Sequence, residues 1–175
     1  AIYGVKEPCY TSSNTIDKTC TTTITADLLT NQTTSPVSTL PSGSKGWFIN
    51  LDLSSSDYYT ERLITDPLAA FNGAVFYTTF SPSMDVCALG GNTNVWAVRY
   101  NTGGAYSGLG GGGLSGKGLI QISTGEIKEI GLGTSFTEKE GRRTVGFQGM
   151  PPKGKGLSVF IGPKPMRKVI HIEER

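Results

Sequence analysis

The sequence contains no apolar run of about 18 residues, the length that a membrane-spanning helix needs. It also lacks a leader-like start, because Ala1 opens directly into sequence that reads as mature. We therefore expect a processed product or a part of a longer chain. Charged residues are scarce, at 17%, and the net charge is only +2. This composition gives no reason to expect nucleic acid as a partner, and we expect no membrane span.

Residues that commonly carry catalysis or bind metals are few. His171 is the only histidine and has no adjacent acid or nucleophile, so we expect no catalytic residue and a non-enzymatic protein. The three cysteines, Cys9, Cys20 and Cys87, do not have the spacing of a zinc site, and we expect no bound metal or cofactor. Cys9 and Cys20 flank a Thr/Ser-rich loop, an arrangement typical of a disulfide in exported proteins. That pairing leaves Cys87 unpaired.

Glycine is abundant, at 24 of 175 residues, while hydrophobic residues make up only 37%. This balance is typical of short strands joined by Gly-rich turns, and no segment has helical periodicity. Gly111–Lys117 matches the start of a phosphate-binding loop, but Gly118 replaces the Ser or Thr that would contact magnesium. The next residues, Leu119–Ile122, read as a strand. We therefore interpret the segment as a glycine-rich loop between strands.

Serine and threonine dominate one segment near the N-terminus, with 15 of the 29 residues in Thr11–Thr39. Large apolar residues are so sparse there that the segment cannot form a core of its own. We predict an extended loop that includes a short strand at Thr21–Thr25. Asn31-Gln32-Thr33 has the form of a glycosylation sequon, to which we assign no role.

Alternating apolar and polar residues predict strands after this loop. Trp47 and the apolar residues at every second position after it share one face of a half-buried strand, Gly46–Leu53. We assign both Trp47 and Trp96 to the core. Three further strands are predicted in this half, at Glu61–Asp66, Ala74–Phe80 and Val95–Tyr100. Four strands joined in sequence by short turns would form a meander sheet, as in one propeller blade.

The second half of the chain repeats this pattern more weakly. Its predicted strands are Gly118–Ile122, Glu126–Ile130, Thr144–Phe147, Leu157–Ile161 and Arg167–Ile172. We therefore predict an all-β fold of antiparallel meander sheets, forming a partial β-propeller of about two to three blades with a long Thr-rich loop. Residues 1–44 would hold an N-terminal strand and the Cys-flanked Thr/Ser-rich loop, and residues 45–175 the propeller blades. A small β-sandwich that closes by itself is the alternative.

Gly46–Ala105 resembles a known family. The segment carries Gly46-Trp47, then Glu61-Arg62 and Asp66-Pro67, then Thr78 and Pro82 within Phe-Tyr-Thr-Thr-Phe-Ser-Pro, and then Asp85 shortly before Cys87. These motifs resemble the C-terminal propeller of the PilC/PilY family, whose members act at the tip of type IV pili. Val86 stands where that family usually has proline.

The resemblance implies a non-enzymatic protein of type IV pilus biogenesis and adhesion, exported to the cell surface, the outer membrane or the pilus tip. Its implied partners are the remaining propeller blades or a second chain, minor pilins and the pilus, and a host or abiotic surface. The family also carries a calcium-binding loop. The nearest candidate here, Asp52–Asp57 with Glu61, lacks the central glycine and the final carboxylate of such loops. The resemblance therefore implies calcium only in parts of the family outside this chain.

Two other functions stay open on the sequence. The quinoprotein-like repeat over Ile64–Ala105 allows a fragment of a pyrroloquinoline-quinone dehydrogenase, although the adjacent cysteine pair of those enzymes is absent here. A generic surface-binding β module, with the Thr-rich loop as its contact, is the other alternative.

Overall fold

The computed structural model describes residues 1–11, 15–51, 59–70, 73–85, 90–106, 116–139, 142–149 and 151–161. Within them the chain forms twelve strands and one short 3-10 helix, η1 (Ala26–Leu28), so the all-β prediction is confirmed. This part of the chain has no helix with the length and apolar character to cross a membrane. The predictions at Asp52–Asp57, Cys87, Gly111–Ser115, Arg167–Ile172 and His171 lie outside the described residues.

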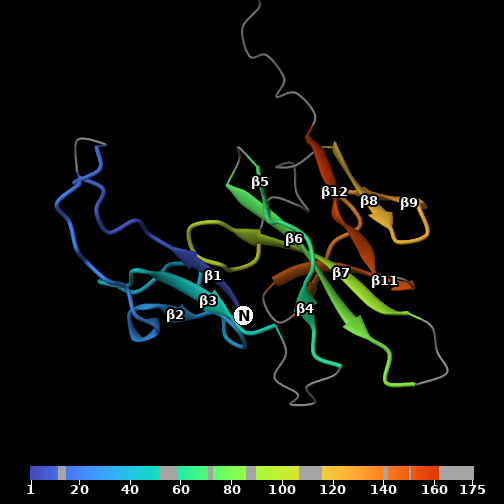
Figure 1. Ribbon diagram of the computed structural model, residues 1–175, viewed down its shortest axis with the longest axis horizontal. Helices are drawn as coiled ribbons and strands as arrows, with labels where there is room; N and C mark the ends of the chain where they lie inside the picture. The colour runs from blue at the N-terminus through green and yellow to red at the C-terminus, as the bar shows by residue number, and fades with distance from the viewer. Residues whose placement is uncertain are drawn as a thin grey trace, which may run out of the picture.

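The strands form three sheets (Figure 1). The N-terminal sheet has the order β1 (Ile2–Val5), β3 (Gly46–Ile49), β2 (Thr30–Asn31). The central sheet has the order β10 (Thr137–Lys139), β11 (Arg142–Gly149), β7 (Gly91–Arg99), β6 (Ala74–Pro82), β4 (Arg62–Leu63), and β5 (Leu68–Ala69) also pairs with β6. The third sheet has the order β12 (Pro152–Ile161), β8 (Gly116–Ile122), β9 (Ile127–Gly131). Only the short β2–β3 pairing is parallel, and within the described residues no sheet closes into a barrel.

The three sheets are stacked, with the central sheet in the middle (Figure 1). The core between the central and third sheets contains Ala74, Phe76, Val95 and Ala97 from one side and Ile120, Ile130 and Leu157 from the other. The core between the central and N-terminal sheets contains Tyr77, Trp96 and Val98 from one side and Ile2, Trp47 and Ile49 from the other. Because successive strand residues point to opposite faces, Val95 to Val98 alternate between the two cores. The middle of the central sheet, β6 and β7, is therefore buried on both faces.

The sheet order corrects the predicted four-strand meander. β3, which starts the predicted strand Gly46–Leu53, does not lie beside β4 but between β1 and β2. Trp47 packs instead onto the face of β6 and β7, with Tyr77 and Trp96. Burial of these aromatic side chains against a sheet face outweighs pairing in sequence order at its edge. The predicted boundary at residue 44 lies within the N-terminal sheet, because β3 pairs with two strands that precede it.

The predicted strand Glu61–Asp66 is also shorter in the structure. Only Arg62–Leu63 forms a strand, β4, and Leu68–Ala69 forms a second short strand beyond Pro67; both pair with β6. Proline has no N–H to donate, so the ladder is interrupted around it. On its other side β6 pairs with β7, and β7 pairs with β11 from the second half of the chain. The central sheet therefore combines both halves.

Other strands lie where the sequence predicts them. β6 and β7 contain Ala74–Phe80 and most of Val95–Tyr100, and β8 contains the residues that follow the glycine-rich segment. β8 and β9 form the predicted hairpin, which turns at Gly125 with φ +92°. The short strand predicted at Thr21–Thr25 is wrong. These residues are mostly exposed and lie in no sheet, and the nearest strand after them is β2.

Candidate functional site

The Gly46-Trp47 motif lies at the junction of the N-terminal and central sheets. Trp47 Nε1 donates a hydrogen bond to Tyr100 O, just after β7, at 2.8 Å. The indole lies against Gly4 of β1 and Gly103 of the turn after β7; a Cβ there would come within 2.2 Å and 2.4 Å of the ring, respectively. Any larger residue at either glycine would displace the ring. Trp47 is buried, as predicted, and its packing and hydrogen bond hold the N-terminal sheet against the central sheet and the turn after β7.

Gly46 allows β1 and β3 to approach each other closely. It has a φ of +152°, and a Cβ at this position would lie 2.1 Å from Gly4 O. Only glycine fits that approach without a shift of the backbone. Both residues of this motif therefore serve the packing of the N-terminal sheet.

Glu61, which precedes β4, is the polar centre of the second motif. Its Oε1 accepts hydrogen bonds from Trp96 Nε1 at 3.1 Å, from Asn94 Nδ2 at 3.5 Å and from the Thr79 hydroxyl. Trp96 Nε1 also donates to Thr79 Oγ1 at 2.8 Å. The half-buried carboxylate thus satisfies donors from β6 and β7, as buried polar groups require. In the part of the chain that the structure describes, no group of three or more His, Cys, Asp or Glu residues could hold a metal.

The remaining motif residues are spread along β4, β6 and the segments around them. Arg62 is the first residue of the short strand β4, and Asp66 follows that strand; both are exposed, and Pro67 lies between β4 and β5. Thr78 is fully buried within β6. Pro82 ends β6 opposite Gly91, and Asp85 is exposed beyond it. These motif residues therefore follow β4 and β6 and the segments that join the strands.

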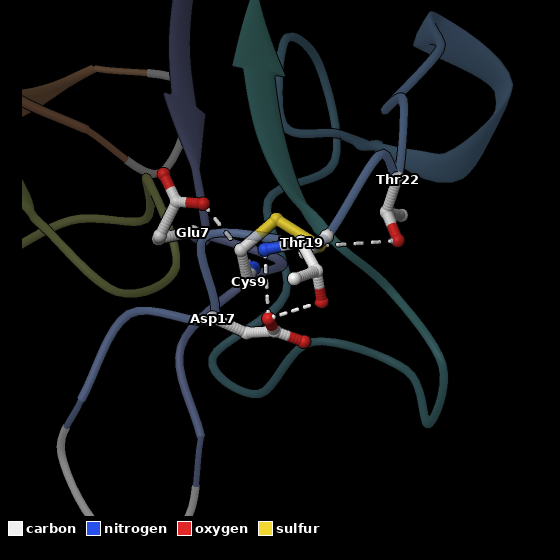
Figure 2. The surroundings of a disulfide bond; sticks show 6 residues. Glu7, Cys9, Asp17, Thr19 and Thr22 are labelled. Carbon is white, nitrogen blue, oxygen red and sulfur yellow. Dashed lines mark hydrogen bonds between the residues drawn. A yellow bond between two sulfur atoms is a disulfide. The ribbon is translucent and has the colours of Figure 1, made fainter.

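The predicted disulfide between Cys9 and Cys20 is confirmed, with an S–S distance of 2.03 Å and a Cα–Cα distance of 5.5 Å. Figure 2 shows the polar groups around it, including Glu7, whose Oε1 accepts a hydrogen bond from Cys9 N at 3.1 Å. Asp17 Oδ1 accepts hydrogen bonds from the hydroxyl and the backbone N–H of Thr19. These bonds, the hydroxyl's first, lower the pKa of the Asp17 carboxyl below its usual 3.8. The oxidised pair is compatible with an exported protein.

The disulfide closes a small ribbon, the Cys9–Cys20 loop, which extends from the N-terminal sheet at one end of the molecule (Figure 1). Thr11 N donates to Thr15 O and Asp17 N donates to Cys9 O, both at 2.8 Å. These bonds lie on either side of the Tyr10–Ile16 bridge. Tyr10 and Ile16 therefore lie directly opposite each other in the ribbon, and opposite residues of an antiparallel pair have their side chains on the same face. Tyr10 and Ile16 are both exposed, so the loop presents a pair of apolar side chains.

Gln32 fixes the rest of the Thr-rich segment to the turn after β7. Its side chain is fully buried; Nε2 donates to Thr102 O at 2.6 Å and to Val37 O at 3.0 Å. Oε1 accepts from Val37 N at 2.7 Å. Thr33 is buried as well, and its hydroxyl accepts from Asn50 N at 3.0 Å. The segment predicted as one extended loop is therefore anchored at its middle. The sequence does not predict this anchor, because the residues around Gln32 are polar like the rest of the segment and give no burial pattern.

Comparison with protein-family models, curated proteins and solved structures found no significant match to this chain. The resemblance of Gly46–Ala105 to the PilC/PilY family therefore rests on the sequence motifs alone. The structure adds the stacked sheets, the polar network at Glu61 and the exposed Cys9–Cys20 loop.

Proposed function

We propose that this chain is a non-enzymatic, exported protein of type IV pilus biogenesis and surface adhesion. It forms part of a propeller whose further blades come from other sequence or from a second chain. Its partners are minor pilins, the pilus and a host or abiotic surface. It acts at the cell surface or pilus tip, where its fold is a scaffold for contact and not a catalyst.

The stacking of the sheets is the observation that carries this proposal. In a two-sheet sandwich each sheet buries one face, whereas here the central sheet buries both. Repeated sheets packed face to face are what successive propeller blades present. The motif residue Trp47 lies in one of these contacts, and Glu61 accepts a hydrogen bond from Trp96 of the same core, which supports the family resemblance without requiring any catalytic group.

The Cys9–Cys20 loop supplies the contact surface in this proposal. The disulfide and the two backbone hydrogen bonds hold the loop before any partner arrives, which lowers the entropy lost on binding. Tyr10 and Ile16 present an aromatic and a β-branched side chain side by side, and aromatic side chains are common anchors of protein contacts.

Gene replacement in the source cells tests the proposal. We expect deletion of the gene to reduce the number of surface pili, counted by electron microscopy, and to weaken adhesion, with both restored by the wild-type gene. The Tyr10→Thr/Ile16→Thr variant should restore the pili but not the adhesion. An Ile127→Thr variant, which changes an equally exposed isoleucine of β9, should restore both. Unchanged pilus number and adhesion after deletion would contradict the pilus role.

The purified, oxidised chain tests the partial-propeller part separately. Light scattering and circular dichroism should reveal aggregation or a broad thermal transition. Addition of the missing blades should remove the aggregation and sharpen the transition. A monodisperse monomer with one sharp transition would instead favour a fold that closes unaided.

A further inference from the structure

β12 is an edge strand of the third sheet, because in the part of the chain that the structure describes it pairs with β8 on one side only (Figure 1). Its register with β8 is regular from Leu157 to Ile161, after a shift between Pro152 and Leu157. The residues Leu157–Ile161 carry no charge. An uncharged edge strand presents backbone N–H and C=O groups on which another strand can pair.

The hydrogen bonds of β8 show which backbone groups of β12 lie on the open edge. Ile122 N donates to Glu126 O, so Ile122 and every second residue before it in β8 bond to β9. The alternate residues of β8 bond to β12, where their partners are Ser158 and Phe160. The backbone groups on the open edge are then those of Leu157, Val159 and Ile161. Outside the β8 ladder, no backbone hydrogen bond among the described residues involves these three.

The side chains of this segment alternate between the core and solvent. Leu157 is buried, and Val159 packs against the same core between the central and third sheets. Ser158 is exposed, and Phe160 is 56% exposed. A strand with the same alternation, paired at this edge, would extend both the apolar and the exposed side of the sheet.

The other strands at sheet edges are less suited to such pairing. β9 and β10 each carry two charged side chains. Pro67 interrupts the edge formed by β4 and β5, and β1 and β2 are only four and two residues long. The part of β11 beyond β10 contains Gly146 and Gly149, and glycine weakens a strand. Charges, proline and short length are common means by which edge strands avoid pairing.

We propose that Leu157–Ile161 of β12 pairs antiparallel with the same segment of a second copy of this chain, across a two-fold axis. With Val159 opposite Val159 of the second copy, Leu157 of each copy lies opposite Ile161 of the other, and all the backbone groups on the open edge are bonded. Lys153 and Lys155 lie outside the paired segment, so the lysines of the two copies do not face each other. The two third sheets become one continuous sheet. This inference does not depend on the proposed pilus function.

Light scattering of the purified, oxidised chain over a concentration series tests the pairing. We expect a dimer, at twice the 18.6 kDa of one chain, that dissociates on dilution. A Val159→Cys variant, with Cys87→Ser to remove the predicted unpaired thiol, places two thiols opposite each other across the axis. Mild oxidation should link the copies through position 159, as mass spectrometry of the linked peptide would show. A wild-type chain that stays monomeric, or a dimer without this link, would overturn the inference. If larger particles form, the link decides.

A matched pair of variants gives a second readout. Ser158 lies opposite Phe160 of the second copy in this register, so Ser158→Lys/Phe160→Lys places like charges opposite each other twice. We expect the dissociation constant of the dimer to rise at least about ten-fold. Met84→Lys/Ile127→Lys adds the same charge at exposed positions elsewhere and should leave that constant unchanged. Circular dichroism checks that both variants fold. Equal weakening by both would mean that net charge and not the edge decides, and would refute the pairing.

Discussion

Thr78 and Thr79 are neighbours in β6 with equal burial but different hydrogen bonding. Both side chains are fully buried. The Thr79 hydroxyl donates to Glu61 and accepts from Trp96 Nε1. The Thr78 hydroxyl, on the opposite face of the sheet, has no hydrogen-bond partner among the described residues. Burial of an unpaired hydroxyl costs free energy, whereas removal of a paired one leaves its partners unsatisfied.

Valine at each position should separate these two effects. Thr78→Val keeps a similar shape and removes the unpaired hydroxyl, so the free energy of unfolding should stay equal or rise by about 1 kcal/mol. Thr79→Val takes a partner from both Glu61 and Trp96, so the free energy of unfolding should fall by about 1–3 kcal/mol. Denaturant unfolding followed by tryptophan fluorescence, at a concentration at which light scattering detects no aggregates, measures both values. Equal destabilisation by the two changes would show that the hydrogen bonds of Thr79 do not decide the outcome.

The burial of single residues was more predictable than their partners. Alternation alone assigned Trp47 and Trp96 to the core, because a strand with one buried face must hide every second side chain. The contacts of Glu61 join positions 18, 33 and 35 residues apart in sequence. They depend on the register of β6 against β7 and on the entry of the chain into β4. No local pattern encodes the register or the entry of the chain, so the sequence identified Glu61 only as part of a motif and of an incomplete calcium-loop candidate.

At the scale of elements, strands were predictable where local chemistry fixed them. The β8–β9 hairpin follows from two alternating runs around Ser-Thr-Gly, with Gly125 able to take positive φ. Neighbours in a sheet were less predictable. β3 pairs with β1 and β11 pairs with β7, each far from its partner in sequence, in addition to the strand just before it. Local sequence patterns therefore predicted where the strands lie but not which strands pair in a sheet.

The Cys9–Cys20 loop is an element that depends on its covalent bond. A two-stranded ribbon without a further strand is only marginally stable in water, and a disulfide restrains its alternatives. In a Cys9→Ser/Cys20→Ser variant we expect trypsin to cleave after the exposed Lys18 at least about ten-fold faster, because the loop opens locally. Mass spectrometry of timed digests measures this rate.

Cleavage after Lys128, which lies in β9 and far from the disulfide in sequence, is the internal control and should keep its rate. The far-UV circular dichroism of the sheets should also stay the same. An unchanged rate at Lys18 would mean that the hydrogen bonds around Tyr10 and Ile16 hold the loop without the disulfide.

At the scale of the whole molecule, alternate side chains of β7 pack into two different cores. β7 directs Val95 and Ala97 toward the third sheet and Trp96 and Val98 toward the N-terminal sheet. Its sequence is nearly continuously apolar here, as expected of a strand with no face in water. The all-β fold was predictable from the alternating runs and the abundant glycine. The central place of β7 was not, because it requires β11 to return from the second half of the chain.

This arrangement predicts a gradient of local stability from the central sheet outward. Amides of β6 and β7 are bonded across the ladder and covered by apolar side chains on both faces, whereas each outer sheet has one face in water. Hydrogen exchange should therefore be slowest at Tyr77–Thr79 and Val95–Val98, and at least about ten-fold faster in β1 and β9. Exchange followed by mass spectrometry or NMR measures the gradient. If β1 and β9 exchange as slowly as β7, the three sheets instead unfold as one cooperative unit.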